Sequence, residues 1–127
     1  MVVQRQLPEF ARSDWYSDRS DHRCPHDAWL ESFEIAELAD GQRKEKRRTA
    51  IVARLLGAYH DGTIVFRYSG VTKFSVASDA AERGLGDWLE DVFEIEGSAI
   101  VHRITWETGS WVITAEDVAY EWLPKPG

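Results

Sequence analysis

One short segment of the chain concentrates side chains that bind metals. His22, Cys24 and His26, hereafter the His22/Cys24/His26 cluster, occupy alternate positions. In an extended backbone, alternate side chains point the same way, so two imidazoles and a thiolate would converge on one zinc ion, with His60 or His102 as a fourth ligand. Structural zinc sites more often use two separated ligand pairs. The other interpretation is therefore a polar lead-in to a strand that starts at His26.

The cysteine of this cluster also has the chemistry of a nucleophile, with a neighbouring histidine as its base. A reactive thiol needs electropositive surroundings, and here Arg23 is opposed by Asp21 and Asp27. No nucleophile-elbow motif or Cys-Gly-Ser-Cys sequence surrounds Cys24. The sequence therefore favours a non-catalytic protein without a cofactor. A small zinc-binding domain or an enzyme that uses the His22/Cys24/His26 cluster is the alternative.

Tryptophans form the second set of side chains suited to a site. The chain has six of them, and tryptophan is enriched both in cores and at the energetic centres of interfaces. Period-two alternation assigns three to the core and leaves three as candidates for an exposed or dimer-forming surface. The first three are Trp29, Trp106 and Trp122, and the others are Trp15, Trp88 and Trp111. In the alternative interpretation, all six are buried.

Carboxylates crowd the C-terminal third of the chain. Glu90, Glu94 and Glu96 recur at even positions, which places them on one face of a strand. Two such groups act as acid and base only when burial separates their pKa values, and nothing in the sequence indicates burial. A solvated acidic face that meets a partner is the better expectation. The candidate contact residues are Trp88, Trp111, Glu90 and Glu94.

The charge balance restricts the class of partner. With 22 acidic and 15 basic residues, the formal net charge is −7, which repels phosphate backbones and attracts cationic surfaces. The basic run 43–48 lacks the aromatic residues that single-strand binders use, so we expect a solvated loop there. These features predict a basic protein partner and no nucleic acid. Exposed aromatics on a sheet also predict a homodimer, with Arg103 paired to Glu90 or Glu94 of the second chain.

The elements that must position these residues are mostly short strands. Residues 1–25 predict an irregular N-terminal arm with a short helix near 9–15, and residues 26–127 predict one β-rich domain. The run 49–59 fits a helix or a strand, and we favour a strand because a turn follows. Asp61-Gly62 predicts a type I′ hairpin turn. A helical turn is expected over 79–83, ended by Gly84, and strands over 29–35, 71–76, 88–95, 100–106, 110–114 and 118–122.

The fold class expected from this pattern is mainly β or α+β, an antiparallel meander sheet with one or two short helices. No apolar stretch is long enough to span a bilayer, and the N-terminus has no apolar signal segment. We therefore expect a cytoplasmic protein without membrane contact.

Parts of the chain resemble a group of small uncharacterised bacterial proteins. The similar segments are 26–32 (HDAWLES), 87–91 (DWLED), 102–109 (HRITWETG) and 117–122 (DVAYEW). The group shows an opening HD strand, a DLLYDE strand, an H-x-I-L-F/W-x-x-G motif and a final D-I-x-x-E strand. This chain departs from it with Glu90 in place of Tyr and Val92-Phe93 in place of Glu-Ile. The resemblance implies a small β-rich, immunity-like protein that binds another protein, and it supplies no catalytic residues.

Overall fold

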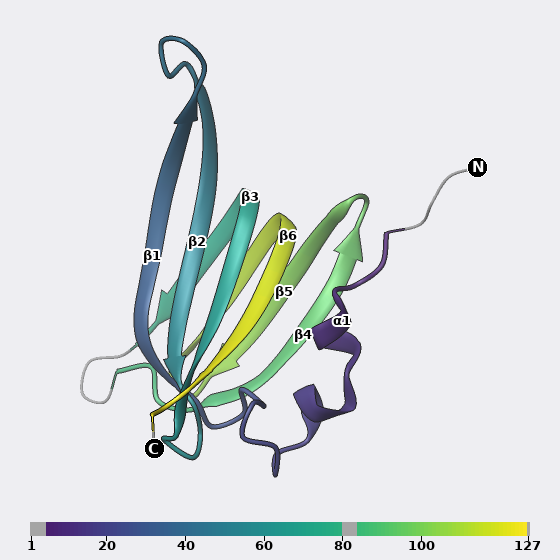
Figure 1. Cartoon of the computed structure of the whole chain (residues 1–127), viewed down its shortest axis with the longest axis vertical. Helices are drawn as coiled ribbons and strands as arrows, with labels where there is room; N and C mark the ends of the chain where they lie inside the picture. Colours follow the sequence, from purple (N-terminus) through teal and green to yellow (C-terminus); the bar gives the residue numbers. More distant parts are fainter. Residues whose placement is uncertain (1–4, 80–83, 127) are drawn as a thin grey trace.

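The chain folds into one antiparallel sheet of six strands, in the order β1-β2-β3-β6-β5-β4 (Figure 1). The computed structural model describes residues 5–79 and 84–126. Two three-stranded meanders, β1 to β3 and β4 to β6, join through the pairing of β3 with β6. The predicted antiparallel, mainly β class with short helices is confirmed. The elements are α1 (Glu9–Arg12), the 3-10 helix η1 (Asp14–Ser17), β1 (Trp29–Asp40), β2 (Lys46–Leu56), β3 (Gly62–Ser78), β4 (Trp88–Glu96), β5 (Ala99–Trp106) and β6 (Gly109–Pro124).

The two longest strands fold the sheet over on itself. β3 and β6 are paired from end to end, but the register shifts between Val71 and Lys73. Gly70, just before this shift, has a φ of 61°. Glycine adopts this left-handed conformation without steric penalty. Figure 1 shows both strands turning near the top of the sheet. The first half of β3 therefore pairs with β2, whereas the first half of β6 pairs with β5.

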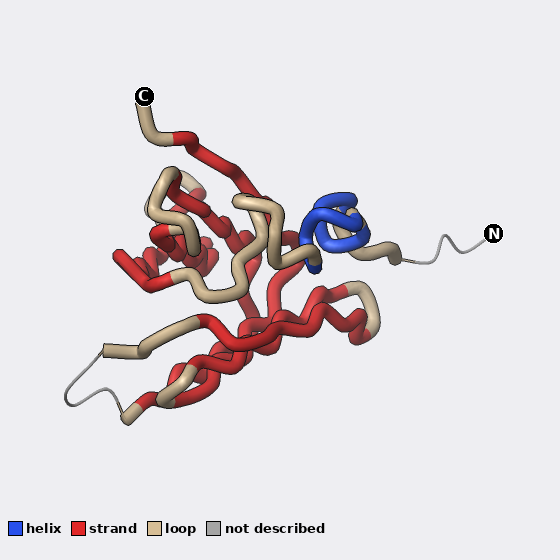
Figure 2. The backbone as a smooth tube through the Cα atoms, turned by 90° about the horizontal axis from the view of Figure 1, so that it is seen from below, coloured by secondary structure: helices blue, strands red, loops and turns tan. Residues whose placement is uncertain are grey.

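This fold creates two layers of strands, whose backbones Figure 2 shows from below. The hydrophobic core lies between them. Phe66 of the front layer stacks on Trp88 of the back layer with ring centroids 5.5 Å apart, and Phe33 meets Trp111 at 4.7 Å. Burial of such large aromatic surfaces supplies much of the stability of a domain this small. The largest fully buried side chains include Trp88, Trp106, Trp111, Tyr68 and Phe66.

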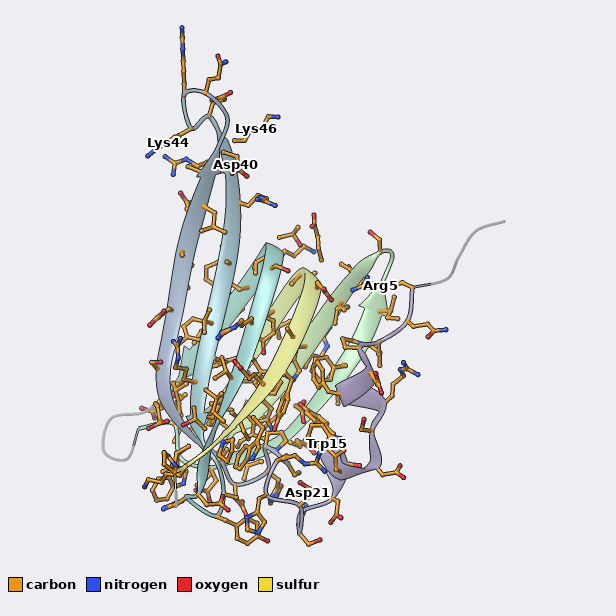
Figure 3. The ribbon with its side chains drawn as sticks, in the orientation of Figure 1. Arg5, Trp15, Asp21, Asp40, Lys44 and Lys46 are labelled. Atoms are coloured by element: carbon orange, nitrogen blue, oxygen red, sulfur yellow. The ribbon has the colours of Figure 1, made fainter. Side chains whose placement is uncertain are left out.

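The N-terminal segment packs on the sheet through aromatic side chains. Phe10 stacks on Tyr120 with centroids 5.4 Å apart and meets Phe93 edge-on at 5.5 Å. Arg23 lies 4.4 Å above the ring of Trp15, and its backbone carbonyl accepts a hydrogen bond from Tyr120. Figure 3 shows Trp15 on this segment. The helix expected near residues 9–15 is present as α1 and η1.

The tryptophans occupy different environments from those that alternation predicts. Trp88 and Trp111 are each 1% exposed, so their assignment to a surface is wrong, whereas Trp29 is 48% exposed and not in the core. Trp106 is buried as expected, and Trp122 packs against the core. Register shifts at the start of β1 and of β4 break the alternation on which those assignments depend. For Trp111 the cause is the second layer, which covers its face of the sheet.

The loop between β2 and β3 is longer than the predicted two-residue turn. The backbone N–H of Gly57 donates to the carbonyl of Gly62 at 2.9 Å, and the N–H of His60 donates to Gly57 at 2.8 Å. The left-handed residue is His60, with a φ of 59°, whereas Gly62 begins β3. The hairpin is therefore present, but its type I′ turn at Asp61-Gly62 is wrong. The run 49–59 forms a strand up to Leu56, and residues 80–83 of the expected helical turn lie outside the described residues.

Gly62→Val should lower the free energy of unfolding by about 1–3 kcal/mol through overpacking. A Cβ at Gly62 would lie 2.4 Å from the Trp122 ring and 2.9 Å from the Leu123 carbonyl oxygen. Denaturant unfolding measures the effect. Combining Gly62→Val with Trp122→Ala should show a cost smaller than the sum of the two single costs, because the smaller side chain makes room. Strict additivity would contradict the proposed clash.

Candidate partner-binding site

The histidines of the His22/Cys24/His26 cluster each engage a different carboxylate. His22 Nδ1 lies 2.5 Å from Asp61 Oδ2, and its ring stacks on Tyr59 with centroids 4.0 Å apart. His26 Nδ1 lies 3.2 Å from Asp27 Oδ2. The backbone here forms successive turns and not the extended conformation on which a shared zinc site depends. That premise of the metal hypothesis is therefore wrong.

Cys24 lies in the interior and is 4% exposed. Burial raises the pKa of its thiol, which favours the protonated and unreactive form. In the part of the chain that the structure describes, no three histidine, cysteine, aspartate or glutamate side chains are grouped to hold a metal ion.

The predicted contact residues do not form one surface. Trp88 and Trp111 are enclosed between the two layers, so neither can meet a partner. Glu90 and Glu94 are exposed on β4. Glu94 already accepts a hydrogen bond of 2.9 Å from Arg103 Nε of its own chain, which is the cation expected to reach it from a second copy.

A buried chain of hydrogen bonds connects the N-terminal segment to three strands. Tyr16 donates its hydroxyl proton to Asp91 Oδ2 at 2.6 Å, and His102 Nε2 lies 2.7 Å from the same oxygen. The hydroxyl of Tyr68 lies 2.7 Å from His102 Nδ1. No local sequence pattern indicates this network, because Asp91 and His102 meet only through the pairing of β4 with β5.

Electrostatics assigns the protons of this network. Burial lowers the pKa of His102 despite the opposing effect of Asp91, and burial raises the pKa values of Tyr16 and Tyr68. Neutral His102 therefore donates from Nε2 to Asp91 and accepts from Tyr68 at Nδ1. The order tyrosine, histidine, aspartate resembles a nucleophile with its base and orienting acid. However, His102 is 0% and Tyr68 1% exposed, which leaves no room for a substrate.

An open cavity of 560 Å³ lies beside Trp29, at the end of the sheet where β1 and β4 begin. The indole Nε1–H of Trp29 donates to Asp87 Oδ1 at 2.6 Å, and the Asp87 backbone N–H donates to Glu107 Oε1 at 2.7 Å. The described residues that line the cavity are Trp29, Leu30, Gly84, Leu85, Gly86, Asp87 and Glu107. We call this site the Trp29 cavity.

Local backbone structure fixes the walls of the Trp29 cavity. The β-bulge between Leu30 and Ser32 begins β1 with Trp29 turned outward. Gly86 has a φ of 77°, and a Cβ there would meet the Glu107 side chain at 2.8 Å. Thr108 donates its hydroxyl to the Leu85 carbonyl at 3.1 Å, which anchors the opposite wall.

The basic run of the sequence lies far from the Trp29 cavity. The basic run 43–48 surrounds the tip of the β1–β2 hairpin, where Figure 3 shows Lys44 and Lys46. Its residues are exposed, as the sequence predicts, but the predicted loop ends earlier, because β2 begins at Lys46. Trp29 begins β1 and Asp40 ends it, so about 36 Å of strand separates this tip from the Trp29 cavity. Among the described lining residues of that cavity, by contrast, the two charged side chains are both carboxylates.

The Trp29 cavity contains side chains of the types that bind cations in proteins. An exposed indole attracts a cation to its face, and nearby carboxylates complete the pairing with charge-assisted hydrogen bonds. Leu30 and Leu85 supply apolar surface for an aliphatic stem. No protein-family model, no curated protein and no solved structure matches the chain. None of the helices in residues 5–79 and 84–126 has the length and apolar character needed to cross a membrane.

Proposed function

We propose that this protein is a non-catalytic binding module that recognises a basic segment of a protein partner, in the manner of an immunity-like neutraliser. The observation that carries the proposal is the Trp29 cavity. There a half-exposed indole is anchored on Asp87, and the two charged residues of the described lining are acidic. A lysine or arginine side chain of the partner fits this combination of aromatic face, apolar wall and carboxylates.

The anchoring of Trp29 supports an interface role. Side chains that contribute most to binding are commonly tryptophans held in place before the partner arrives, because ordering them on binding would cost free energy. The hydrogen bond to Asp87 fixes the indole, and the ring of His60 packs edge-on against it at 4.7 Å. The site therefore presents Trp29 in a single orientation.

The net charge of −7 supports the same class of partner. A negative surface steers a basic protein toward the site and accelerates association, most strongly at low ionic strength. A protein with one buried cysteine has no structural need for an oxidising compartment. The bacterial cytoplasm is the setting that we propose, and the immunity-like resemblance of the sequence supports it.

Capture from a lysate of the source cells tests this function. The immobilised protein should retain a basic protein in stoichiometric amount, and retention should fall as the salt concentration rises. Trp29→Ala should abolish retention, and Glu107→Gln should weaken it about tenfold, which corresponds to about 1.4 kcal/mol. Glutamine at this position can still accept the Asp87 N–H, so the variant removes charge and preserves the cavity wall.

Glu94→Gln is the matched control. It removes one exposed carboxylate from the same protein, on β4, and should leave retention unchanged. Equal weakening by Glu94→Gln and Glu107→Gln would show that net charge alone attracts the captured protein. Full retention by Trp29→Ala would overturn the assignment of the Trp29 cavity.

A further inference from the structure

Most strand edges of the sheet carry features that block pairing with another strand. The β1 edge has a bulge at its start and four acidic side chains along it, at positions 31, 34, 37 and 40. The β4 edge also has a bulge and carries Glu90, Glu94 and Glu96. Bulges and charges of this kind are the usual protection of an exposed edge. The second half of β6 is flanked by the N-terminal segment, since Arg5 donates to the Glu116 carbonyl at 2.8 Å.

The second half of β3 lacks this protection. Residues 71–78 pair with β6 on one side, and the pairing of β3 with β2 ends at Tyr68, so the other side of this half-strand has no neighbour among the described strands. Residues 72–78 are all exposed. The segment VTKFSVAS carries one charge, at Lys73, and contains neither proline nor glycine. Its free backbone N–H and C=O groups can be satisfied by another extended strand.

Two apolar side chains on this edge face the core side of the sheet and remain in solvent. Phe74 and Val76 are 46% and 44% exposed. In register they align with Ile113 and Trp111, which are buried on that face. The row of core side chains therefore continues to the β3 edge, where it is left uncovered. A strand added at this edge would extend the sheet and cover both residues.

We propose that residues 71–78 of β3 pair antiparallel with the same residues of a second copy of this chain. A two-fold axis at Ser75 places Phe74 of each copy opposite Val76 of the other, twice in the interface. Aromatic and β-branched residues are favourable cross-strand partners. Lys73 falls opposite Ala77, so no like charges face each other. The four-strand back layer thereby becomes a continuous sheet across the dimer.

The segment is self-complementary, and this selects a second copy over a foreign strand. One symmetric contact satisfies both β3 edges at once and closes the assembly, as two-fold dimers do. The protected β1 and β4 edges prevent further growth of the sheet. The interface lies on β3 and does not use the Trp29 cavity, so this proposal does not depend on the proposed function.

Cysteine cross-linking of the full-length protein tests the register. In an antiparallel pair, directly opposed Cα atoms lie about 4.5–5.5 Å apart, which suits a disulfide. Ser75→Cys should therefore form a covalent dimer under mild oxidation. Val92→Cys, at an exposed position on the β4 edge, should not. The unmodified protein should remain uncross-linked because Cys24 is buried.

Sedimentation equilibrium tests the association itself. The protein should sediment as a dimer at micromolar concentration, and Val76→Lys should weaken dimerisation at least about tenfold by introducing an inward-pointing charge at the edge. Val92→Lys makes the same change at a similarly exposed site and should have no effect. A monomer at all concentrations, or a Ser75→Cys protein that cross-links no faster than Val92→Cys, would overturn the proposal.

Discussion

Asp91→Ala should lower the free energy of unfolding by about 3 kcal/mol. The substitution removes the acceptor of two buried donors, the Tyr16 hydroxyl and His102 Nε2–H. Each buried donor left without a partner costs about 1–3 kcal/mol. Asp91 also lines a cavity of 340 Å³ beneath the N-terminal segment, so water can enter and recover part of the loss. Denaturant unfolding followed by tryptophan fluorescence measures the change.

Glu94→Ala provides the control on the same strand. Glu94 is a carboxylate of similar chemistry, but it is half exposed and its partner Arg103 is also in solvent. Exposed ion pairs of this kind contribute less than about 1 kcal/mol. The loss of the Tyr16 hydrogen bond should also loosen the N-terminal segment, so limited proteolysis within residues 5–28 should accelerate for Asp91→Ala only. Similar stability of the two variants would contradict a structural role for the network.

The same network makes stability depend on pH. Burial holds the pKa of His102 below its ordinary value of 6.5, so the unfolded chain takes up this proton more readily than the folded chain. The contribution of neutral His102 to stability is therefore complete above pH 6.5 and falls as the pH drops below that value. The ion pair with Arg23 lowers the pKa of Asp21 to about 2, so its contribution is lost at much lower pH. His102→Asn should flatten the slope just below pH 6.5, and an unchanged slope would assign it to other groups.

The positions of the strands are predictable because they depend mainly on local sequence patterns. The alternating runs predict the positions of most strands, and the turn after β2 correctly favours a strand over a helix. The prediction of separate strands over 110–114 and 118–122 is wrong, because both belong to β6. Local patterns do not indicate which faces of the strands pack against each other. A single strand shows that Trp111 alternates with Val112, but only the fold of β3 and β6 at Gly70 brings Phe33 over Trp111. The surface assigned to Trp88 and Trp111 was wrong for this reason.

The candidate site was less predictable than the fold. Alternation assigns Trp29 to the core and not to a site, because the bulge two residues later, which reverses the face of the strand, leaves no sign in the local pattern. Asp87 follows Trp29 by 58 residues in the sequence, and Glu107 follows Asp87 by 20. Such contacts depend on topology and have no local signal. The zinc site predicted at the His22/Cys24/His26 cluster has the opposite problem. Its local spacing suggests that the three side chains converge, but only an extended backbone would bring them together, and the backbone here forms turns.

Among the glycines compared, Gly109→Ala should be the most destabilising substitution. We expect it to lower the free energy of unfolding by more than about 3 kcal/mol. A Cβ at Gly109 would lie 2.0 Å from the Ala77 carbonyl oxygen and 2.7 Å from Ser78 Cα. These are backbone atoms of the neighbouring strand, so no side-chain rotation can relieve the contact. Either β3 or the turn before β6 must move, which breaks the pairing of Ser78 with Gly109.

Movement at this point would propagate into the core. Gly109 pairs with Trp106 of β5 and lies two residues before Trp111, and both tryptophans are buried. Gly97→Ala is the control, because its Cβ meets nothing within 4 Å and only its φ of 65° opposes the change. That strain costs about 1–2 kcal/mol. Calorimetric or denaturant unfolding should therefore rank Gly109→Ala well below Gly97→Ala in stability. Equal stability would mean that β3 and β6 can move apart at Gly109 at little cost, which would contradict a tight backbone contact between Gly109 and Ala77.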